Sequence, residues 1–141
     1  MRSQKGQVAI MFALVLALVL SGLIALVGDV ILLYDAAGRY DNGALVGAQA
    51  GASQVNRTAL RDGQVTLDGG RATAVCVEAA VLTSGLAPSE VRCTLSPDNR
   101  SVTSRVSHRM PLVFAVYGPG LTITRGHTGT IAVGESQGTA P

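Results

Sequence analysis

Residues 8–27 read VAIMFALVLALVLSGLIALV, a run of twenty residues without a charged side chain. A helix rises about 1.5 Å per residue, so this run is long enough to cross the roughly 30 Å hydrocarbon core of a bilayer. Arg2 and Lys5 precede it, and basic residues beside a span are retained on the cytoplasmic side. The sequence therefore predicts one membrane span at about residues 8–28, with the N-terminus in the cytoplasm and the C-terminal part outside.

A secretory signal that is cleaved near residue 28 is the alternative interpretation of this run. The apolar part of such a signal is usually about 7 to 15 residues long and ends at a small-x-small site. The run here is longer, and residues 25–28, ALVG, match that site poorly. The sequence favours a retained anchor.

Charge is divided unevenly between the N-terminus and the rest of the chain. The sequence has 11 Lys plus Arg and 9 Asp plus Glu. Two of the 11, Arg2 and Lys5, lie ahead of the span, so the nine that follow it balance the nine acidic residues. With a neutral exported part, no evident basic face and 4% aromatic residues, we expect no nucleic-acid partner.

The helical pattern continues beyond the span. No proline occurs before Pro88, and apolar or small residues recur every three or four positions as far as Val55. We therefore expect a basic leader over residues 1–6 and one helix over residues 7–57, on the order of 75 Å long. Its second half should project from the bilayer and needs a partner.

This second half carries a strip of small residues, which we call the helix-packing strip. Its members recur every fourth residue in two adjacent rows and are Gly43, Gly47 and Gly51 with Ala44, Ala48 and Ala52. Each glycine inside a helix costs about 1 kcal/mol relative to alanine, but small residues let another backbone come close. The strip is predicted to pack against the chain's own globular domain, against neighbouring subunits, or against both.

Residues 58–134 are predicted to form a small exported α+β head. Gly63 and residues 68–70 mark a break after the long helix. A short helix over residues 71–83 should follow, with Val75, Ala79 and Leu82 on one face and its end near Gly85.

Beyond this short helix the apolar period changes to two, which is typical of strands. We expect about three antiparallel strands, over residues 90–96, 101–110 and 121–133, with residues 97–99 as a hairpin turn between the first two. Val91, Cys93 and Leu95 should point inward from the first strand, and Val102 and Val106 from the second. Residues 111–120 form an apolar connection, and residues 135–141 a flexible tail.

Cys76 and Cys93 are the only cysteines. An export compartment permits a disulfide between them, which would stabilise the head by about 3 kcal/mol through loop entropy. Two buried free thiols are the alternative. The sequence contains no CxxC pair, so a redox or zinc site is not expected.

The other candidate residues give little support for catalysis. His108 and His127 belong to no recognisable nucleophile or metal pattern and are predicted to be surface histidines. Asp29 follows the span and is expected either to be solvated at the outer interface or to contact a basic group or free N-terminus of another subunit. We predict no catalytic residue, cofactor, metal or small-molecule substrate.

Several of these segments resemble one family. Residues 6–14, GQVAIMFAL, then Asp29, Tyr34 and Arg39, and the Ala/Gly-rich residues 43–52 are similar to the N-terminal region of TadE/TadG-like pilus-assembly proteins. The polar strand at residues 101–109, the following MPLVF at 110–114 and the Thr-rich 121–124 are similar to the end of TadE-like chains.

The resemblance implies a pilin-like N-terminal helix and a pseudopilin-like, minor-pilin role in a tight-adherence (Flp, type IVc) pilus or related secretion apparatus of the bacterial cytoplasmic membrane. The implied partners are other pilin or pseudopilin subunits, the assembly machinery and a prepilin peptidase that cleaves between Gly6 and Gln7. Met11 stands where cleaved members carry glutamate. The alternatives are therefore that Gly6 only begins the helix of a static anchor, or that the chain is a membrane-tethered exported binding domain or enzyme.

Overall fold

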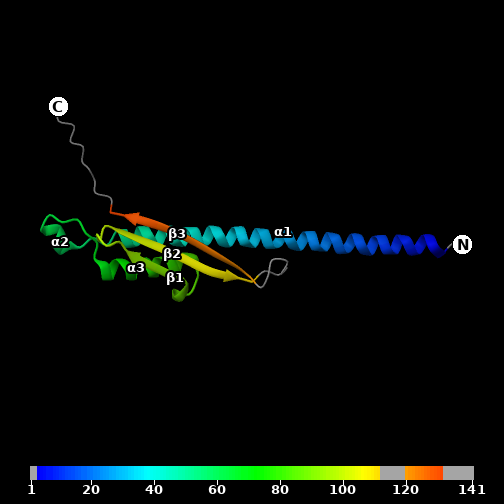
Figure 1. The fold of residues 1–141 in the computed structure, drawn as a ribbon. Coiled ribbons are helices and arrows are strands. Elements are labelled where there is room, and N and C mark those ends of the chain that lie inside the picture. The colour runs from blue at the N-terminus through cyan, green and yellow to red at the C-terminus, as the bar shows by residue number, and fades with distance from the viewer. Residues whose placement is uncertain (1–2, 112–119, 132–141) are drawn as a thin grey trace, which may run out of the picture. The chain divides into compact units, whose positions relative to one another are not determined.

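The structure, a computed structural model, describes residues 3–111 and 120–131, with side chains from residue 7 onward. The chain divides into two compact units, one made of residues 1–36 and 110–121 and the other of residues 37–109 and 122–141. The elements are α1 (Ser3–Ala52), α2 (Arg57–Arg61), α3 (Gly69–Ser84), η1 (Pro88–Glu90), β1 (Val91–Leu95), β2 (Ser101–Met110) and β3 (Leu121–Thr130) (Figure 1). The predicted α+β fold with a long N-terminal helix is confirmed.

Helix α1 is a single α-helix of 50 residues. It includes residues 3–6, which were assigned to the leader, and it ends at Ala52, a few residues before the predicted end at residue 57. The chain leaves the helix because the next residues pair elsewhere: Val55 forms a bridge with Leu67, and the Asn56 amide donates to the Thr66 carbonyl at 2.9 Å.

Helix α2 was not predicted. It is one short turn, and its N-cap is Asn56, whose side chain accepts hydrogen bonds from the amides of Thr58 at 3.0 Å and Ala59 at 3.2 Å. Asparagine is among the best N-cap residues because its oxygen satisfies such amides. The cap was readable from the sequence, but the segment is too short to show an apolar period.

Helix α3 confirms the short helix that was predicted, and its caps explain its ends. Asp68 accepts a hydrogen bond from the Arg71 amide at 3.3 Å. Gly85 follows the last turn with a φ of 72°, a left-handed conformation that glycine adopts without strain.

The three strands form one sheet in the order β1-β2-β3. β1 and β2 are antiparallel, with Val91 opposite Val106 and Leu95 opposite Val102. These residues and Cys93 alternate with neighbours that are more exposed than they are, so the inward positions predicted for both strands are confirmed. The hairpin turn is also confirmed, with Asn99 at a φ of 54°.

Strand β3 pairs with β2, and two hydroxyl contacts give the register. The Thr103 and Thr128 hydroxyl groups are hydrogen-bonded at 2.9 Å, and those of Ser107 and Thr124 at 3.1 Å. Residue numbers rise along β2 as they fall along β3, so the pair is antiparallel. β3 ends at Thr130, and residues 132–133 of the predicted strand lie outside the described residues, as do residues 112–119 of the connection and the predicted tail.

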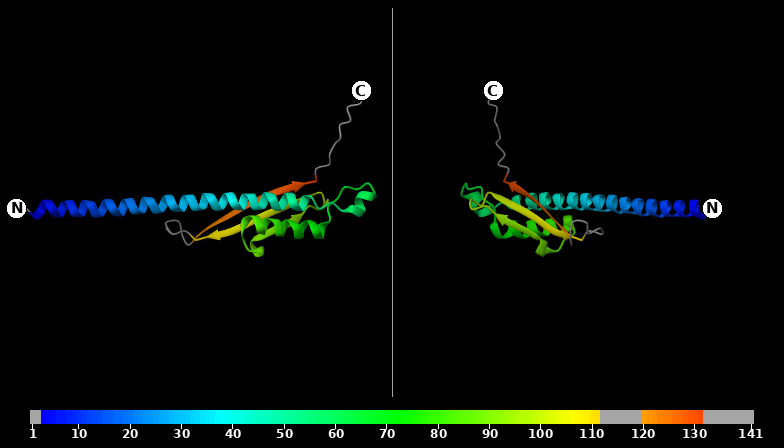
Figure 2. Two further views of the ribbon diagram at one scale, coloured as in Figure 1. Left: turned by 180° about the vertical axis from the view of Figure 1, so that it is seen from behind. Right: turned by 45° about the vertical axis from the view of Figure 1, so that its right-hand side comes forward.

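The core of the second unit lies where α3 and the sheet meet the C-terminal part of α1. Figures 1 and 2 show β1–β3 beside α3 and this part of α1. One buried cluster consists of Leu67, Ala72, Cys76 and Val102, with Cys93, Leu95 and Ile131 packed against it. Most of the buried side chains are small, so the unit has a limited apolar core.

Candidate functional site

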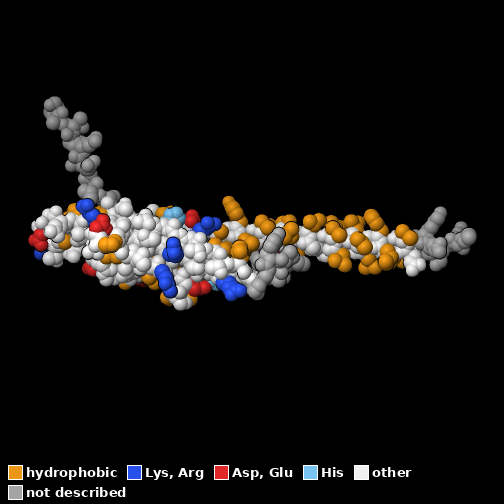
Figure 3. Space-filling view, viewed as in Figure 1, with side chains coloured by type: hydrophobic (Ala, Val, Ile, Leu, Met, Phe, Trp, Pro, Cys, Tyr) orange, Lys and Arg blue, Asp and Glu red, His pale blue; other side chains and the backbone are white. Residues whose placement is uncertain are grey.

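The first part of α1 presents a continuous apolar surface. Every residue from 7 to 21 is exposed, and the large exposed side chains include Val8, Ile10, Phe12, Leu14, Leu18 and Ile24. Figure 3 shows these hydrophobic side chains covering this stretch of the helix. Exposed apolar surface of this extent marks a contact with lipid or with another protein.

Within the described residues, α1 is the one helix that is long and apolar enough to cross a membrane. None of its most apolar window is buried against other parts of the chain. It is therefore a candidate single membrane span, as the sequence predicted for residues 8–28.

The helix-packing strip is covered by the chain's own head. A Cβ at Gly43 would lie 2.8 Å from Ser84 Cβ, and one at Gly47 would lie 2.8 Å from Ala80 Cβ. A Cβ at Gly51 would lie 2.9 Å from the carbonyl oxygen of Ala72. Ala44 and Ala48 are also buried, and Ala52 is half-buried. Of the two partners considered for the strip, the structure places the chain's own α3 against it.

The facing side of α3 consists of small residues at a spacing of four, and its buried positions are Ala72, Cys76, Ala80 and Ser84. The face predicted to carry Val75, Ala79 and Leu82 is not the buried one: Val75 and Ala79 are half-buried, and Leu82 is 77% exposed. The physical reason is that α3 lies at backbone distance from the glycines of α1, so only its smallest side chains fit between the two helices. The largest apolar residues of α3 therefore lie away from this contact.

Strand β3 also approaches α1 through a glycine that the sequence analysis did not single out. A Cβ at Gly129 would lie 2.8 Å from the carbonyl carbon of Ala48 and 3.0 Å from Ala52 Cβ. An isolated glycine inside a strand often marks a close backbone approach. Residues 128–130 read TGT, so an isolated glycine in a predicted strand was visible in the sequence.

Cys76 and Cys93 form a disulfide, with a Cα–Cα distance of 6.2 Å and a sequence separation of 17. The bond joins the buried face of α3 to β1. It therefore holds α3, the element that covers the helix-packing strip, onto the sheet.

Asp29 is buried, with 7% of its surface exposed, and it has an interaction partner. The expectation of a carboxylate simply solvated at the outer interface is therefore wrong. Burying a charge without a partner is costly, so a buried aspartate beside an apolar run requires such an interaction.

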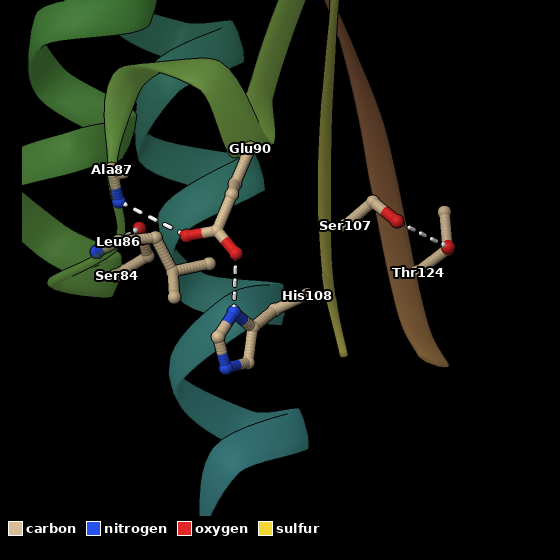
Figure 4. Close-up of polar contacts among 7 residues, drawn as sticks. All are labelled: Ser84, Leu86, Ala87, Glu90, Ser107, His108 and Thr124. Atoms are coloured by element: carbon tan, nitrogen blue, oxygen red, sulfur yellow. Dashed lines mark hydrogen bonds and ion pairs between the residues drawn. The ribbon is translucent and has the colours of Figure 1, made fainter. Parts of the chain in front are cut away.

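His108, on β2, lies in a small polar cluster with Glu90 of η1 (Figure 4). Its Nδ1 donates to Glu90 Oε1 at 2.5 Å, and its ring meets that of Tyr40 edge-on with 5.6 Å between centroids. The Ala87 amide donates to Glu90 Oε2 at 3.1 Å. These two hydrogen bonds lower the pKa of Glu90 below its usual value, and the bond from His108 has the larger effect.

His127 makes a similar connection from β3. Its Nε2 donates to Asp41 Oδ1 at 3.0 Å. Both histidines are partly buried, and they contact consecutive residues of α1: His108 contacts Tyr40, and His127 contacts Asp41. Both histidines keep a surface position, as predicted, with 29% and 35% of their side chains exposed, and each also contacts α1.

The remaining predicted site residues are less informative. The backbone at Gly6 and Gln7 is helical, and Gln7 is exposed. In the part of the chain that the structure describes, no group of three or more His, Cys, Asp or Glu side chains is placed to hold a metal ion.

Comparison with known proteins gives no assignment. No protein-family model, no curated protein and no solved structure matches this chain significantly.

Proposed function

We propose that this chain is a membrane-anchored, pseudopilin-like (minor pilin) subunit of a tight-adherence (Flp, type IVc) pilus or related secretion apparatus. It acts by assembly and not by catalysis. The observation that carries the proposal is a single helix, α1, whose first part exposes only apolar or small residues between Val8 and Val27 and whose last part is packed into a small head.

The orientation follows from two features at opposite ends of the chain. Arg2 and Lys5 ahead of the apolar run favour a cytoplasmic N-terminus. The Cys76–Cys93 disulfide favours an oxidising compartment for the head, because disulfides persist outside the cytoplasm. Both features support a head on the outer side of the cytoplasmic membrane.

Like helices are the partners that the exposed part of α1 fits best. Its small residues form one row with a spacing of four, namely Ala9, Ala13, Ala17 and Ser21, and all of them are exposed. In lipid, where apolar side chains give no net driving force, helices associate through such small residues because their backbones pack closely. The helix-packing strip is covered by α3, so contacts between subunits must use other faces of α1.

The intact mass of the membrane-extracted protein tests the processing step. Loss of residues 1–6 is the result expected for a subunit handled by a prepilin peptidase. A full-length N-terminus instead supports the second candidate, a static anchor or scaffold that is not polymerised, which Met11 at the family's glutamate position favours.

Photocrosslinking from the apolar segment tests assembly itself. The Ala17→Leu variant should lose crosslinked oligomers because the larger side chain blocks close approach, whereas Leu18→Ala, on an adjacent face, should retain them. Unchanged crosslinking in Ala17→Leu, or loss only in Leu18→Ala, contradicts the proposed contact. Protease protection in intact cells should show the head outside the membrane in both variants.

A further inference from the structure

Two arginines face each other on the outer side of the sheet. The register of β1 and β2 places Arg92 directly opposite Arg105, and both side chains are exposed. Like charges at directly opposite cross-strand positions are destabilising. Neither arginine has an ion-pair partner among the described residues. This pair therefore presents two positive charges to the solvent.

The pair borders a polar hollow of about 440 Å³. The lining consists entirely of polar residues, which are Ser89, Glu90, Arg92, Arg105, Ser107 and Thr124. The Glu90 carboxylate is directed at the Ala87 amide and His108, and the Ser107 and Thr124 hydroxyls lie close together on β2 and β3 (Figure 4). A hollow of this size accommodates a small ligand, and its two guanidinium groups outnumber its single carboxylate.

The same face continues beyond the hollow with the same chemistry. Arg109 lies four residues beyond Arg105 on β2, about 13 Å along the strand at roughly 3.3 Å per residue. Exposed threonines occupy the alternate positions of β3 and are Thr122, Thr124, Thr128 and Thr130. The outward positions of the three strands contain no acidic and no aromatic residue.

We propose that this face binds an acidic polysaccharide. A carboxylate of one sugar unit is held between Arg92 and Arg105, and Ser107 and Thr124 bind its hydroxyl groups. The planar guanidinium group matches a carboxylate with two parallel hydrogen bonds. A single-stranded nucleic acid fits less well, because the face offers no aromatic ring for base stacking.

This surface corrects the expectation that the head has no basic face. Arg92 and Arg105 are separated along the chain, and the exported part is neutral in sum. The strand register alone brings them together.

The test measures binding of full-length protein in detergent micelles to polygalacturonate, a polymer with one carboxylate per sugar. The Arg92→Gln/Arg105→Gln variant should lose affinity by roughly tenfold for each arginine. The matched control, Arg57→Gln/Arg61→Gln, removes the same charge from α2 and should bind within twofold of the unmodified protein. The thermal midpoint of the first variant should not fall, because the substitution removes a like-charge pair.

Competing ligands identify the chemistry that is recognised. Neutral dextran should not bind, and duplex DNA and polyglutamate should bind more weakly than polygalacturonate. The proposal is overturned if the folded, unmodified protein does not bind polygalacturonate or if the control variant loses as much affinity. Equal or tighter binding of DNA or polyglutamate also overturns it, because the site would then recognise charge and not an acidic sugar.

Discussion

The two ends of α1 differ in what covers them, although they belong to one helix. From residue 7 to residue 21 every side chain is exposed and most are large and apolar. Around Gly43, Gly47 and Gly51 the helix is buried against α3 at backbone distance. The comparison teaches that side-chain size decides the partner: large aliphatic residues suit lipid, whereas small residues admit a neighbouring backbone.

The difference also has an energetic side. Large apolar side chains left in water are unfavourable by about 25 cal/mol per Å², so the first part of α1 needs an apolar environment from outside the chain. The C-terminal part of α1 buries mainly small side chains, such as Ala44 and Ala48. Its attachment therefore depends on close packing, on the Cys76–Cys93 disulfide and on the contacts of His108 and His127.

The largest expected effect comes from placing arginine at an exposed leucine of the apolar run, compared with the same substitution at an exposed leucine of the head. Leu18→Arg should weaken membrane insertion by about 3 to 4 kcal/mol, because arginine at the centre of a span is strongly unfavourable and leucine is favourable. Leu82→Arg, on α3, is the control and should change the stability of the head by less than about 0.5 kcal/mol. An insertion assay measures the effect of Leu18→Arg, and thermal unfolding measures the effect of Leu82→Arg on the head. If Leu18→Arg inserts as well as the unmodified protein, the apolar run is not a membrane span.

The next largest effect should be confined to the head. Replacing both cysteines, as Cys76→Ala/Cys93→Ala, should lower the free energy of unfolding by about 3 kcal/mol, because the unfolded chain regains the entropy of a closed loop. Urea unfolding in detergent, followed by circular dichroism, measures the loss. Membrane insertion should be unchanged, since the apolar run does not include either cysteine. A head as stable as before would show that the disulfide contributes little.

A matched pair of glycines tests the close approach of α1 and α3. Gly47→Ala should destabilise the head by about 2 kcal/mol, since the added Cβ would lie 2.9 Å from the Cys76 carbonyl oxygen and 2.8 Å from Ala80 Cβ. Gly38→Ala meets no atom within 4 Å and should stabilise the helix by about 1 kcal/mol. Unfolding curves of the two variants should therefore shift in opposite directions. Shifts in the same direction would contradict close packing at Gly47.

The smallest effect depends on pH. The hydrogen bonds from His108 and Ala87 hold the pKa of Glu90 below its model-peptide value of 4.5. The ionised carboxylate therefore stabilises the folded state above about pH 4.5, and this contribution is lost as the pH falls through the lower folded-state pKa.

Glu90→Gln should accordingly lower the thermal midpoint slightly at pH 7, and the difference from the unmodified protein should shrink toward pH 3. His108→Gln removes the main hydrogen-bond donor to the Glu90 carboxylate. It should also lower the thermal midpoint at pH 7, and this difference should likewise shrink toward pH 3. A Glu90→Gln difference that stays constant from pH 7 to pH 3 would show that the ionised carboxylate is not what stabilises the contact.

Much of the fold was predictable because its signals are local. The Gly85 cap, the alternation of Val102 and Val106 and the hairpin at residues 97–99 each depend on a few neighbouring residues, and the structure has all of them. The errors concern choices between faces. Apolar character groups Leu82 with Val75 and Ala79 on one face of α3, but the side that packs against the glycines of α1 carries Ala80 and Ser84.

The candidate sites divide in the same way. The apolar run, the strip of small residues and the cysteine pair were all visible in the sequence. The environments of His108 and His127 were not, because their partners, Tyr40 and Asp41, lie far away along the chain.

By itself, the sequence determined that this protein has one long helix with an apolar first part, a short helix at the place of α3 and three strands, because periodicity, caps and turns act over neighbouring residues. Only the tertiary structure decided what covers the glycines, how deeply Asp29 is buried and that Arg92 meets Arg105. The physical reason is that helix separation and strand register depend on contacts between residues distant in sequence, and no local pattern specifies them.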